Sequence, residues 1–267
     1  DVGAEGYVDL ALRDAINAGD VVGPRMQVAT LAIGSTGGHN DLTGFSPYLH
    51  FDGPSGVADG KDEIRKMVRT QVKLGADVIK VMATGGVLTE EKDVGAPQYA
   101  QEELDVLVEE ARMWGKKVAA HAHGTIGIKR AISAGVASIE HGCILDDEAI
   151  AMMKKLGTVL VADIYNDDVI VADYEKLGYP QKILDKEKQV GRIQRESFRR
   201  AVRAGVKIAF GTDAGVYPHG DNAKQFKKMV EWGASPLLAI QAATVDAAAL
   251  MDWSADVGDD KAGAYAE

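Results

Sequence analysis

Residues 117–142 read KVAAHAHGTIGIKRAISAGVASIEHG and contain one complete strand–helix–strand unit. The hydrophobic pattern predicts a strand over Lys117–Ala120, a helix over Ile126–Ala134 and a second strand over Ala137–Glu140. Gly135 ends the helix and the next strand starts directly after it, which is the short helix-to-strand connection of a parallel α/β fold. The unit therefore predicts two neighbouring parallel strands whose carboxyl ends lie at the same edge of one sheet.

The same glycine connection recurs at 74–80 (LGADVIK) and at 204–210 (AGVKIAF), so the unit is repeated along the chain. The strands expected from this pattern are Met26–Ile33, Asp77–Met82, Lys117–Ala120, Ala137–Glu140, Thr158–Ala162 and Val206–Phe210. The helices expected around them are 6–19, Lys61–Leu74, Gln101–Trp114, Ile126–Ala134, Asp147–Leu156, one that ends near Ala204, Ala223–Trp232 and Pro236–Leu250. The alternation predicts a (β/α)₈ TIM-type barrel that is incomplete at its N-terminal end. No linker divides the chain, so residues 1–267 are expected to form a single domain.

The composition is that of an ordinary globular protein, with 46% hydrophobic residues and a formal net charge of -10. The negative charge argues against a general nucleic-acid binder, which needs a basic face. No apolar run approaches the roughly 20 residues that span a bilayer, so no membrane association is expected. The single cysteine, Cys143, predicts no internal disulfide, and cytoplasm is the default location. Because the first residue is Asp1, we expect the chain to begin inside a longer reading frame.

Four polar residues each close one of the short apolar strands. They are Lys80 in VIKVMATGG, His121 in KVAAHAHG, His141 in ASIEHG and Asp213 in KIAFGTDAG. In a barrel of repeated strand–helix units, the carboxyl ends of the strands meet at one mouth, where active sites form. Imidazole and carboxylate groups are good ligands for zinc and similar metals. The pattern therefore predicts that these four residues form a metal site that serves hydrolysis.

Lys80 lies inside an apolar strand, where burying an unpaired ammonium costs several kcal/mol. Three interpretations remain open: a partly exposed lysine at a strand end, a Schiff-base lysine with a lowered pKa, and a lysine carboxylated by carbon dioxide. Carboxylation turns the cation into a bridging carboxylate. Nearby histidines and an aspartate favour this last interpretation, because metal cations would stabilise the new anion.

His121 and His123 alternate along one strand, so their side chains share a face. We expect His121, at the strand end, to bind metal and His123, further into the loop, to contact substrate. The alternative for His141 is a core histidine bonded to a backbone carbonyl, and the alternative for Asp213 is the cap of the next helix. Near a metal, Asp213 would bind the ion, take a proton from the bound water and pass it to the leaving group.

Other residues are weaker candidates for contacts with substrate. His219 in YPHG is either a loop residue or part of the site. Tyr165 either polarises a carbonyl or is a plain surface tyrosine. The TGG sequence places Gly85 and Gly86 where their backbone N–H groups would bind a carboxylate or an oxyanion.

The Gly-, Ser- and Thr-rich segment 34–60 is too long for an ordinary connection and is a candidate active-site loop. It contains His39 and His50. Cys143, directly after EHG, is expected to be a small residue near a strand end, with a nucleophile as the alternative.

At these residues the chain resembles the amidohydrolase superfamily, and more closely its imidazolonepropionase-like branch, which includes Xaa-Pro dipeptidases and related metallo-carboxypeptidases. The matching stretches follow the family's order over nearly the whole chain, which is much more specific than any single match. They are GPRM at 23–26, STGGHND at 35–41, IKVMATGGV at 79–87, AAHAHG at 119–124, SIEHG at 138–142, FGTDAG at 210–215, PHG at 218–220 and the AAT of QAATVDAAAL. The resemblance implies a barrel with two divalent metals, usually zinc. Carboxylated Lys80 would bridge them, His121 and His141 would bind one, and Asp213 would bind the other and act as acid/base.

The chain departs from the family pattern at its N-terminal end. The family carries a His-x-His pair on its first strand, and no such pair stands before Gly23. The family's small β-sandwich is not expected either. One metal shared by Lys80, His121 and His141 would remain, while the second metal and full activity are in question. An open barrel exposes strand edges, which favours association, so a homo-oligomer is expected.

The sequence therefore predicts a metal-dependent amidohydrolase that hydrolyses amide bonds of short peptides or N-acyl amino acids. The expected cofactor is one or two divalent ions, most often zinc in this family, together with carboxylated Lys80. The expected partner is a small-molecule or short-peptide substrate. Two alternatives stay open: a Schiff-base aldolase barrel that uses Lys80, and an inactive or fragmentary scaffold kept for binding or assembly.

Overall fold

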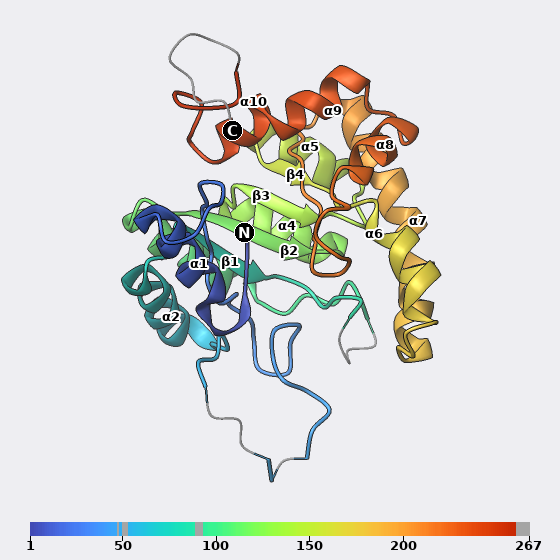
Figure 1. Ribbon diagram of the computed structural model, residues 1–267. Coiled ribbons are helices and arrows are strands. Elements are labelled where there is room, and N and C mark those ends of the chain that lie inside the picture. The colour runs from blue at the N-terminus through green and yellow to red at the C-terminus, as the bar shows by residue number, and fades with distance from the viewer. Residues whose placement is uncertain (47, 50–52, 89–92, 260–267) are drawn as a thin grey trace.

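Figure 1 shows the computed structural model, which describes residues 1–46, 48–49, 53–88 and 93–259. Its sheet has four parallel strands in the order β1-β2-β3-β4. They are β1 (Val78–Met82), β2 (Lys117–Ala122), β3 (Ser138–His141) and β4 (Val159–Val161). Strand order in the sheet equals strand order in the sequence, and one helix lies between each pair. This confirms the predicted α/β fold with parallel strands.

Helices pack against one face of the sheet, and further helices lie beyond its two edges (Figure 1). They are η1 (Glu5–Tyr7), α1 (Val8–Ala18), α2 (Gly60–Leu74), α3 (Gln101–Met113), α4 (Thr125–Ala134), α5 (Asp147–Leu156), α6 (Asn166–Val169), η2 (Ile170–Tyr174), α7 (Gln181–Ala204), α8 (Lys224–Glu231), α9 (Pro236–Ala243) and α10 (Val245–Leu250). The helices α2 to α5 contact one another in chain order. In Figure 1, α1 and α2 lie near β1, whereas the red C-terminal helices lie toward β4.

The predicted strand Met26–Ile33 is an extended segment along β1 rather than a regular strand. The Ile33 N–H donates to the Lys80 carbonyl at 2.8 Å, and the Met82 N–H donates to the Ile33 carbonyl at 2.8 Å. The backbone of Thr30 has a φ of 63°, in the left-handed region. A left-handed residue interrupts the extended ladder, which explains why only one bridge, between Ile33 and Val81, forms here.

The predicted strand at 206–210 lies along β4 in the same way. A single parallel bridge joins Ile208 to Leu160, supported by a hydrogen bond from the Ala209 N–H to the Leu160 carbonyl at 3.0 Å. The six segments predicted from the sequence therefore lie in chain order, with regular pairing in the central four.

Three predicted helices have different bounds. The helix expected at 6–19 is a short η1 turn followed by α1, because Tyr7 has a φ of 60°. The helix expected at Pro236–Leu250 is divided into α9 and α10 at Thr244, whose φ and ψ are -122° and -94°. The helix expected to end near Ala204 is α7, and the shorter helix α6 and the π-helical turn η2 precede it.

Alternation along the strands separates an apolar face from a polar one. Ile79, Ala120, Ile139 and Leu160 are fully buried and belong to the main hydrophobic core with the surrounding helices. Their sequence neighbours Lys80, His121 and Glu140 point to the other face of the sheet, as period-two alternation requires. Polar side chains are thereby held on rigid strands inside the curve of the sheet. None of the helices in the described ranges is long and apolar enough to cross a membrane.

Candidate metal centre

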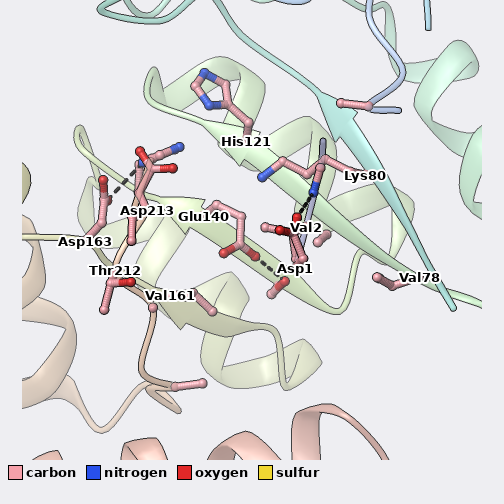
Figure 2. A pocket seen from close by; sticks show the side chains of 18 of the residues that line it. Asp1, Val2, Val78, Lys80, His121, Glu140, Val161, Asp163, Thr212 and Asp213 are labelled. Carbon is pink, nitrogen blue, oxygen red and sulfur yellow. Dashed lines mark hydrogen bonds and ion pairs between the residues drawn. The ribbon is translucent and has the colours of Figure 1, made fainter. Parts of the chain in front are cut away.

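The polar side chains at the strand ends line one cavity of about 950 Å³. Lys80, His121, His141 and Asp213, which the sequence predicts to lie together, all line it. Figure 2 shows Lys80 extending from β1 toward Glu140, with Asp213 on the opposite side of the same space. The structure thus brings the four predicted residues to a common site.

Three histidines form the first cluster in this cavity. One ring nitrogen from each of His121, His123 and His141 lies within 4.8 Å of the others. The ring centroids of His121 and His123 are 4.5 Å apart, and each is 4.6 Å from that of His141. Three imidazole nitrogens at this spacing form a set that suits a divalent transition metal.

Two carboxylates share His141 in a second cluster. Ligand atoms of His141, Asp163 and Asp213 also lie within 4.8 Å of one another. His141 Nδ1 lies 2.9 Å from Asp163 Oδ1, so the ring N–H donates to the carboxylate and Nε2 remains available. A carboxylate that orients an imidazole in this way is a recurring feature of metal sites.

The backbone at two of these residues is strained. His141 has a φ of 69° and Asp213 has a φ of 51°, both in the left-handed region that side chains other than glycine rarely adopt. Such conformations cost of order 1–3 kcal/mol each and persist where the surrounding structure fixes them, often at functional sites. Here they aim the two side chains into the cavity at the ends of their strands.

The donor chemistry of the first cluster fits a metal. His121 Nε2 is buried and has no hydrogen-bond partner in the described part of the chain. Burial, together with His39 and the neighbouring histidines, holds the pKa of His121 well below its ordinary value. Burial and His141 do the same to the pKa of His123. Neutral imidazoles with a free nitrogen are the form that binds metal.

Asp163 is ionised and held by several donors. Burial opposes its negative charge, but His141 outweighs this and keeps the pKa of Asp163 at about 2. Gln194 Nε2 donates to Asp163 Oδ1 at 2.7 Å, and Asn166 Nδ2 donates to Asp163 Oδ2 at 2.6 Å. Burial alone would lower the pKa of His141, yet Asp163 and Asp213 leave it raised.

Asp213 faces the cavity in a different electrostatic state. Burial and the nearby charge of Asp163 raise the pKa of Asp213 to about 6, although His141 opposes the shift. Its Oδ2 accepts a hydrogen bond from Asn166 Nδ2 at 3.1 Å. Asp213 is exposed, and it lines the cavity. A carboxylate with a pKa near 6 is suited to exchanging protons near neutral pH.

Lys80 is 5% exposed, which contradicts the interpretation of a partly exposed lysine at a strand end. Burial lowers its pKa, and the negative charges of Glu140 and Asp213 only partly oppose this. Glu140 is itself bound by the Ser138 hydroxyl, which donates to Glu140 Oε1 at 2.5 Å. Within the described chain, the Lys80 ammonium has no hydrogen bond of its own, so both a modified lysine and a Schiff-base lysine remain chemically reasonable.

The long loop contributes His39 to the site, as its composition suggested. The ring of His39 stacks on that of His121, with centroids 4.2 Å apart and an angle of 21° between the planes. This approach requires glycine at position 86, because a Cβ there would lie 2.1 Å from His39 Cε1. His50 lies outside the described residues.

The remaining candidate residues differ in whether they line the cavity. His123 and His219 line the cavity, and His123 Nδ1 lies 2.8 Å from Cys143 Sγ. Tyr165 is not among the lining residues and packs edge-on against Tyr217, with ring centroids 5.1 Å apart. Gly85 does not offer its N–H to a ligand, because this group donates to the Ala96 carbonyl at 2.9 Å.

The whole chain is similar to proteins of a known family. A model of the amidohydrolase family matches residues 1–267, which is the whole chain. The chain belongs to the amidohydrolase family. The resemblance inferred from the motifs is therefore confirmed.

This amidohydrolase chain is similar to an ochratoxinase from Aspergillus niger, with 36% identity over an alignment of 265 residues that covers 92% of this chain. A crystal structure of an Xaa-Pro dipeptidase with methionine bound in its active site shares 44% identity and a TM-score of 0.93, and it covers 99% of this chain. The crystal structure of the ochratoxinase has a TM-score of 0.80. The chain spans 55% of the ochratoxinase sequence and 66% of the dipeptidase chain.

Sequence reasoning did not select two acidic residues of this amidohydrolase site. Asp163 lies two residues after the end of β4, and the rule that picked out the other strand ends would have found it. Glu187 lines the cavity from α7. Its signal was an acid on the apolar side of a helix, in register with Leu184 and Val190.

Proposed function

We propose that the protein is a metal-dependent amidohydrolase that cleaves amide bonds of short peptides or N-acyl amino acids. The observation that carries the proposal is the pair of ligand clusters that share His141, one of three histidines and one of His141 with two carboxylates, and within each cluster the ligand atoms lie within 4.8 Å of one another. The related ochratoxinase and Xaa-Pro dipeptidase support this class of reaction. The cavity of about 950 Å³ has room for a substrate of dipeptide size.

We assign the metal, for which zinc suits the nitrogen and oxygen donors, to His121, His141, Asp213 and Lys80. A divalent cation held there would supply Lewis-acid chemistry, which activates water and polarises an amide carbonyl. His123 completes the cluster of imidazoles and would hold either the ion or the substrate. Asp163 fixes the ring of His141 through Nδ1, which leaves Nε2 as the atom that would bind the ion.

Asp213 is the proposed acid/base. Its carboxylate accepts the proton of the attacking water as the oxygen bonds to the carbonyl carbon. The protonated Asp213 then donates that proton to the amide nitrogen as the C–N bond breaks. In the metal-free protein, burial raises the pKa of Asp213 to about 6, and a bound cation would lower it and favour the carboxylate that accepts the proton.

Carboxylation of Lys80 is part of the proposal. The ammonium is buried and lies among Glu140, Asp163 and Asp213, but it forms no hydrogen bond with a described residue. Burial lowers its pKa, which increases the neutral amine that carbon dioxide requires. The resulting carboxylate would be stabilised by the cation.

Replacement of Asp213 by Asn tests the assignment. The isosteric amide can neither accept the proton from water nor return it, so kcat/KM for dipeptides should fall at least about 1,000-fold while most of the metal stays bound. Asp221→Asn is a matched control, since Asp221 pairs with Lys224 outside the cavity. Retention of activity in Asp213→Asn would refute the role. Borohydride trapping of a carbonyl substrate on Lys80, without bound metal, would favour the aldolase alternative instead.

A further inference from the structure

Gln225 on α8 is a fully buried residue that does not line the cavity. Both ends of its side-chain amide bind main-chain groups of the segment that follows β4. Gln225 Nε2 donates to the Ala162 carbonyl at 2.5 Å, and Gln225 Oε1 accepts from the Tyr165 N–H group at 2.9 Å. In the sequence, these two bonds lie on either side of Asp163, the carboxylate that binds His141.

The segment after β4 needs these bonds because the strand pairing ends before it. In the described chain, β4 and the neighbouring segment 206–210 are joined by one parallel bridge, between Leu160 and Ile208. Ala162 lies two residues beyond this bridge and is buried. A buried carbonyl group is costly unless it accepts a hydrogen bond. A glutamine amide has the same donor and acceptor groups as a peptide bond, so Gln225 does here what a neighbouring strand does elsewhere in a sheet.

The helix α7 binds the same segment at different atoms. Arg195 Nε donates to the Ile164 carbonyl at 3.1 Å, and Gln194 Nε2 donates to Asp163 Oδ1 at 2.7 Å. The helix α7 therefore binds the carboxylate and one carbonyl, whereas Gln225 binds the main chain before and after Asp163. The two bonds of Gln225 thus fix where the main chain of Asp163 lies, and with it the distance from its carboxylate to His141.

The start of α8 also contacts the segment that carries Asp213. Asn222 Nδ2, which lies just before the helix, donates to Thr212 Oγ1 at 2.9 Å. The rings of Phe210 and Phe226 stack, with centroids 4.3 Å apart. The helix therefore adjoins both segments that supply a carboxylate to the second cluster.

We propose that Gln225 is a positioning residue for the metal site. It holds the main chain around Asp163 so that Asp163 Oδ1 accepts from His141 Nδ1, and this bond leaves His141 Nε2 available for the ion. Gln225 lies outside the cavity, so its effect passes through Asp163 and His141. This inference rests on the proposed function, because that function assigns His141 to the metal.

The test compares the zinc affinity of Gln225→Met with that of Met229→Ala. Methionine has nearly the length of glutamine but no amide, so both main-chain groups lose their partner. Met229 is a buried core residue one turn further along α8, so its truncation lowers stability while the Gln225 amide stays in place. In competition with a chromogenic chelator, Gln225→Met should bind zinc about tenfold more weakly than the wild-type protein. Met229→Ala should stay within about twofold of wild type, even at an equal loss of stability in urea.

Wild-type zinc affinity in Gln225→Met would overturn the inference, and so would an equal loss of affinity in Met229→Ala. Gln225→Asn is the second variant, in case Gln225→Met does not fold. It keeps an amide but is one methylene shorter, so it cannot reach both main-chain groups. Its zinc affinity should also fall, and an unchanged affinity would equally count against a positioning role.

Nitrogen NMR of the metal-free protein separates this inference from the proposed function. If the wild-type protein binds no zinc, the proposed function fails, and the ring of His141 decides the inference. Its signal is identified by its loss in His141→Gln. At alkaline pH the ring should carry its proton on Nδ1 alone in the wild-type protein, and the proton should be shared between the two ring nitrogens in Gln225→Met. The same single tautomer in both proteins would reject the role of Gln225.

Discussion

His141 Nδ1 lies 2.9 Å from Asp163 Oδ1, and this contact joins the histidine cluster to the carboxylate cluster. A strand positions each member of the pair, because His141 ends β3 and Asp163 follows β4. Asp163 stays ionised with a pKa of about 2, which makes the ring N–H the donor. Nε2 of His141 is then left available as a ligand atom, and His141 is the residue that the two clusters share.

Substitution of Asp163 by Asn should weaken metal binding. The amide has one acceptor oxygen for three donors, so the His141 ring loses its fixed orientation and its raised pKa falls. Loss of a carboxylate that orients a ligand typically costs 10- to 100-fold in metal affinity or activity. Competition with a chromogenic chelator measures the affinity, and Asp173→Asn on the surface serves as the control. Unchanged affinity in Asp163→Asn would show that the pair is only structural.

Lys80→Met should weaken metal binding without lowering the stability of the metal-free protein. Methionine removes a buried ammonium that has no hydrogen bond to any described residue, so the metal-free variant should unfold at the same or a higher urea concentration than the metal-free wild type. Its metal affinity should fall at least tenfold, because the proposed bridging carboxylate is gone. Bicarbonate should increase metal uptake by the wild-type protein and by the exposed control Lys66→Met, but not by Lys80→Met. Equal uptake with and without bicarbonate would argue against carboxylation.

Gly86→Ala should displace His39 from the site. The added Cβ would lie 2.1 Å from His39 Cε1, so the ring must move away from His121. Overpacking of this kind costs about 1–3 kcal/mol of unfolding free energy. The double variant Gly86→Ala/His39→Ala should recover most of that loss, since it removes the ring that clashes. Failure to recover stability in urea unfolding would place the strain elsewhere.

Glu187 should make the metal-free protein less stable as the pH rises. Burial raises the pKa of Glu187 from its ordinary value of 4.5 to about 8, so the folded state holds this proton over a range in which the unfolded state has lost it. The free energy of unfolding should therefore decrease from pH 5 to pH 8. In Glu187→Gln the decrease should be smaller by more than about 1 kcal/mol. Identical slopes for wild type and Glu187→Gln, measured by urea unfolding, would contradict the assignment.

The sequence predicted the fold, and it predicted that four polar residues would meet at one cavity, because both depend on a local repeat. Lys80, His121, His141 and Asp213 each end an apolar strand, and parallel strands carry such ends to one edge. The irregular segment at 26–33 was not predictable in this way, since the left-handed Thr30 accompanies its hydrogen bond to the distant Gln71.

Glu187 and His39 show the other limit of local patterns. Glu187 reaches the cavity because α7 packs with its apolar side inward, and the one local sign of that packing is the three-residue spacing of Glu187 from Leu184 and Val190. His39 reaches His121 from a loop whose path depends on Gly86, many residues away in the sequence. The family resemblance guided the site assignment where spacing alone left alternatives open.

The central claim is that His121, His141, Lys80 and Asp213 hold a catalytic divalent metal. The most direct test is elemental analysis of the purified protein, combined with a dipeptidase assay before and after chelation. We expect at least one zinc or similar ion per chain, loss of activity on its removal and recovery when it is returned, with no metal retained by the double variant His121→Ala/His141→Ala. Full dipeptidase activity in protein free of metal would contradict the account.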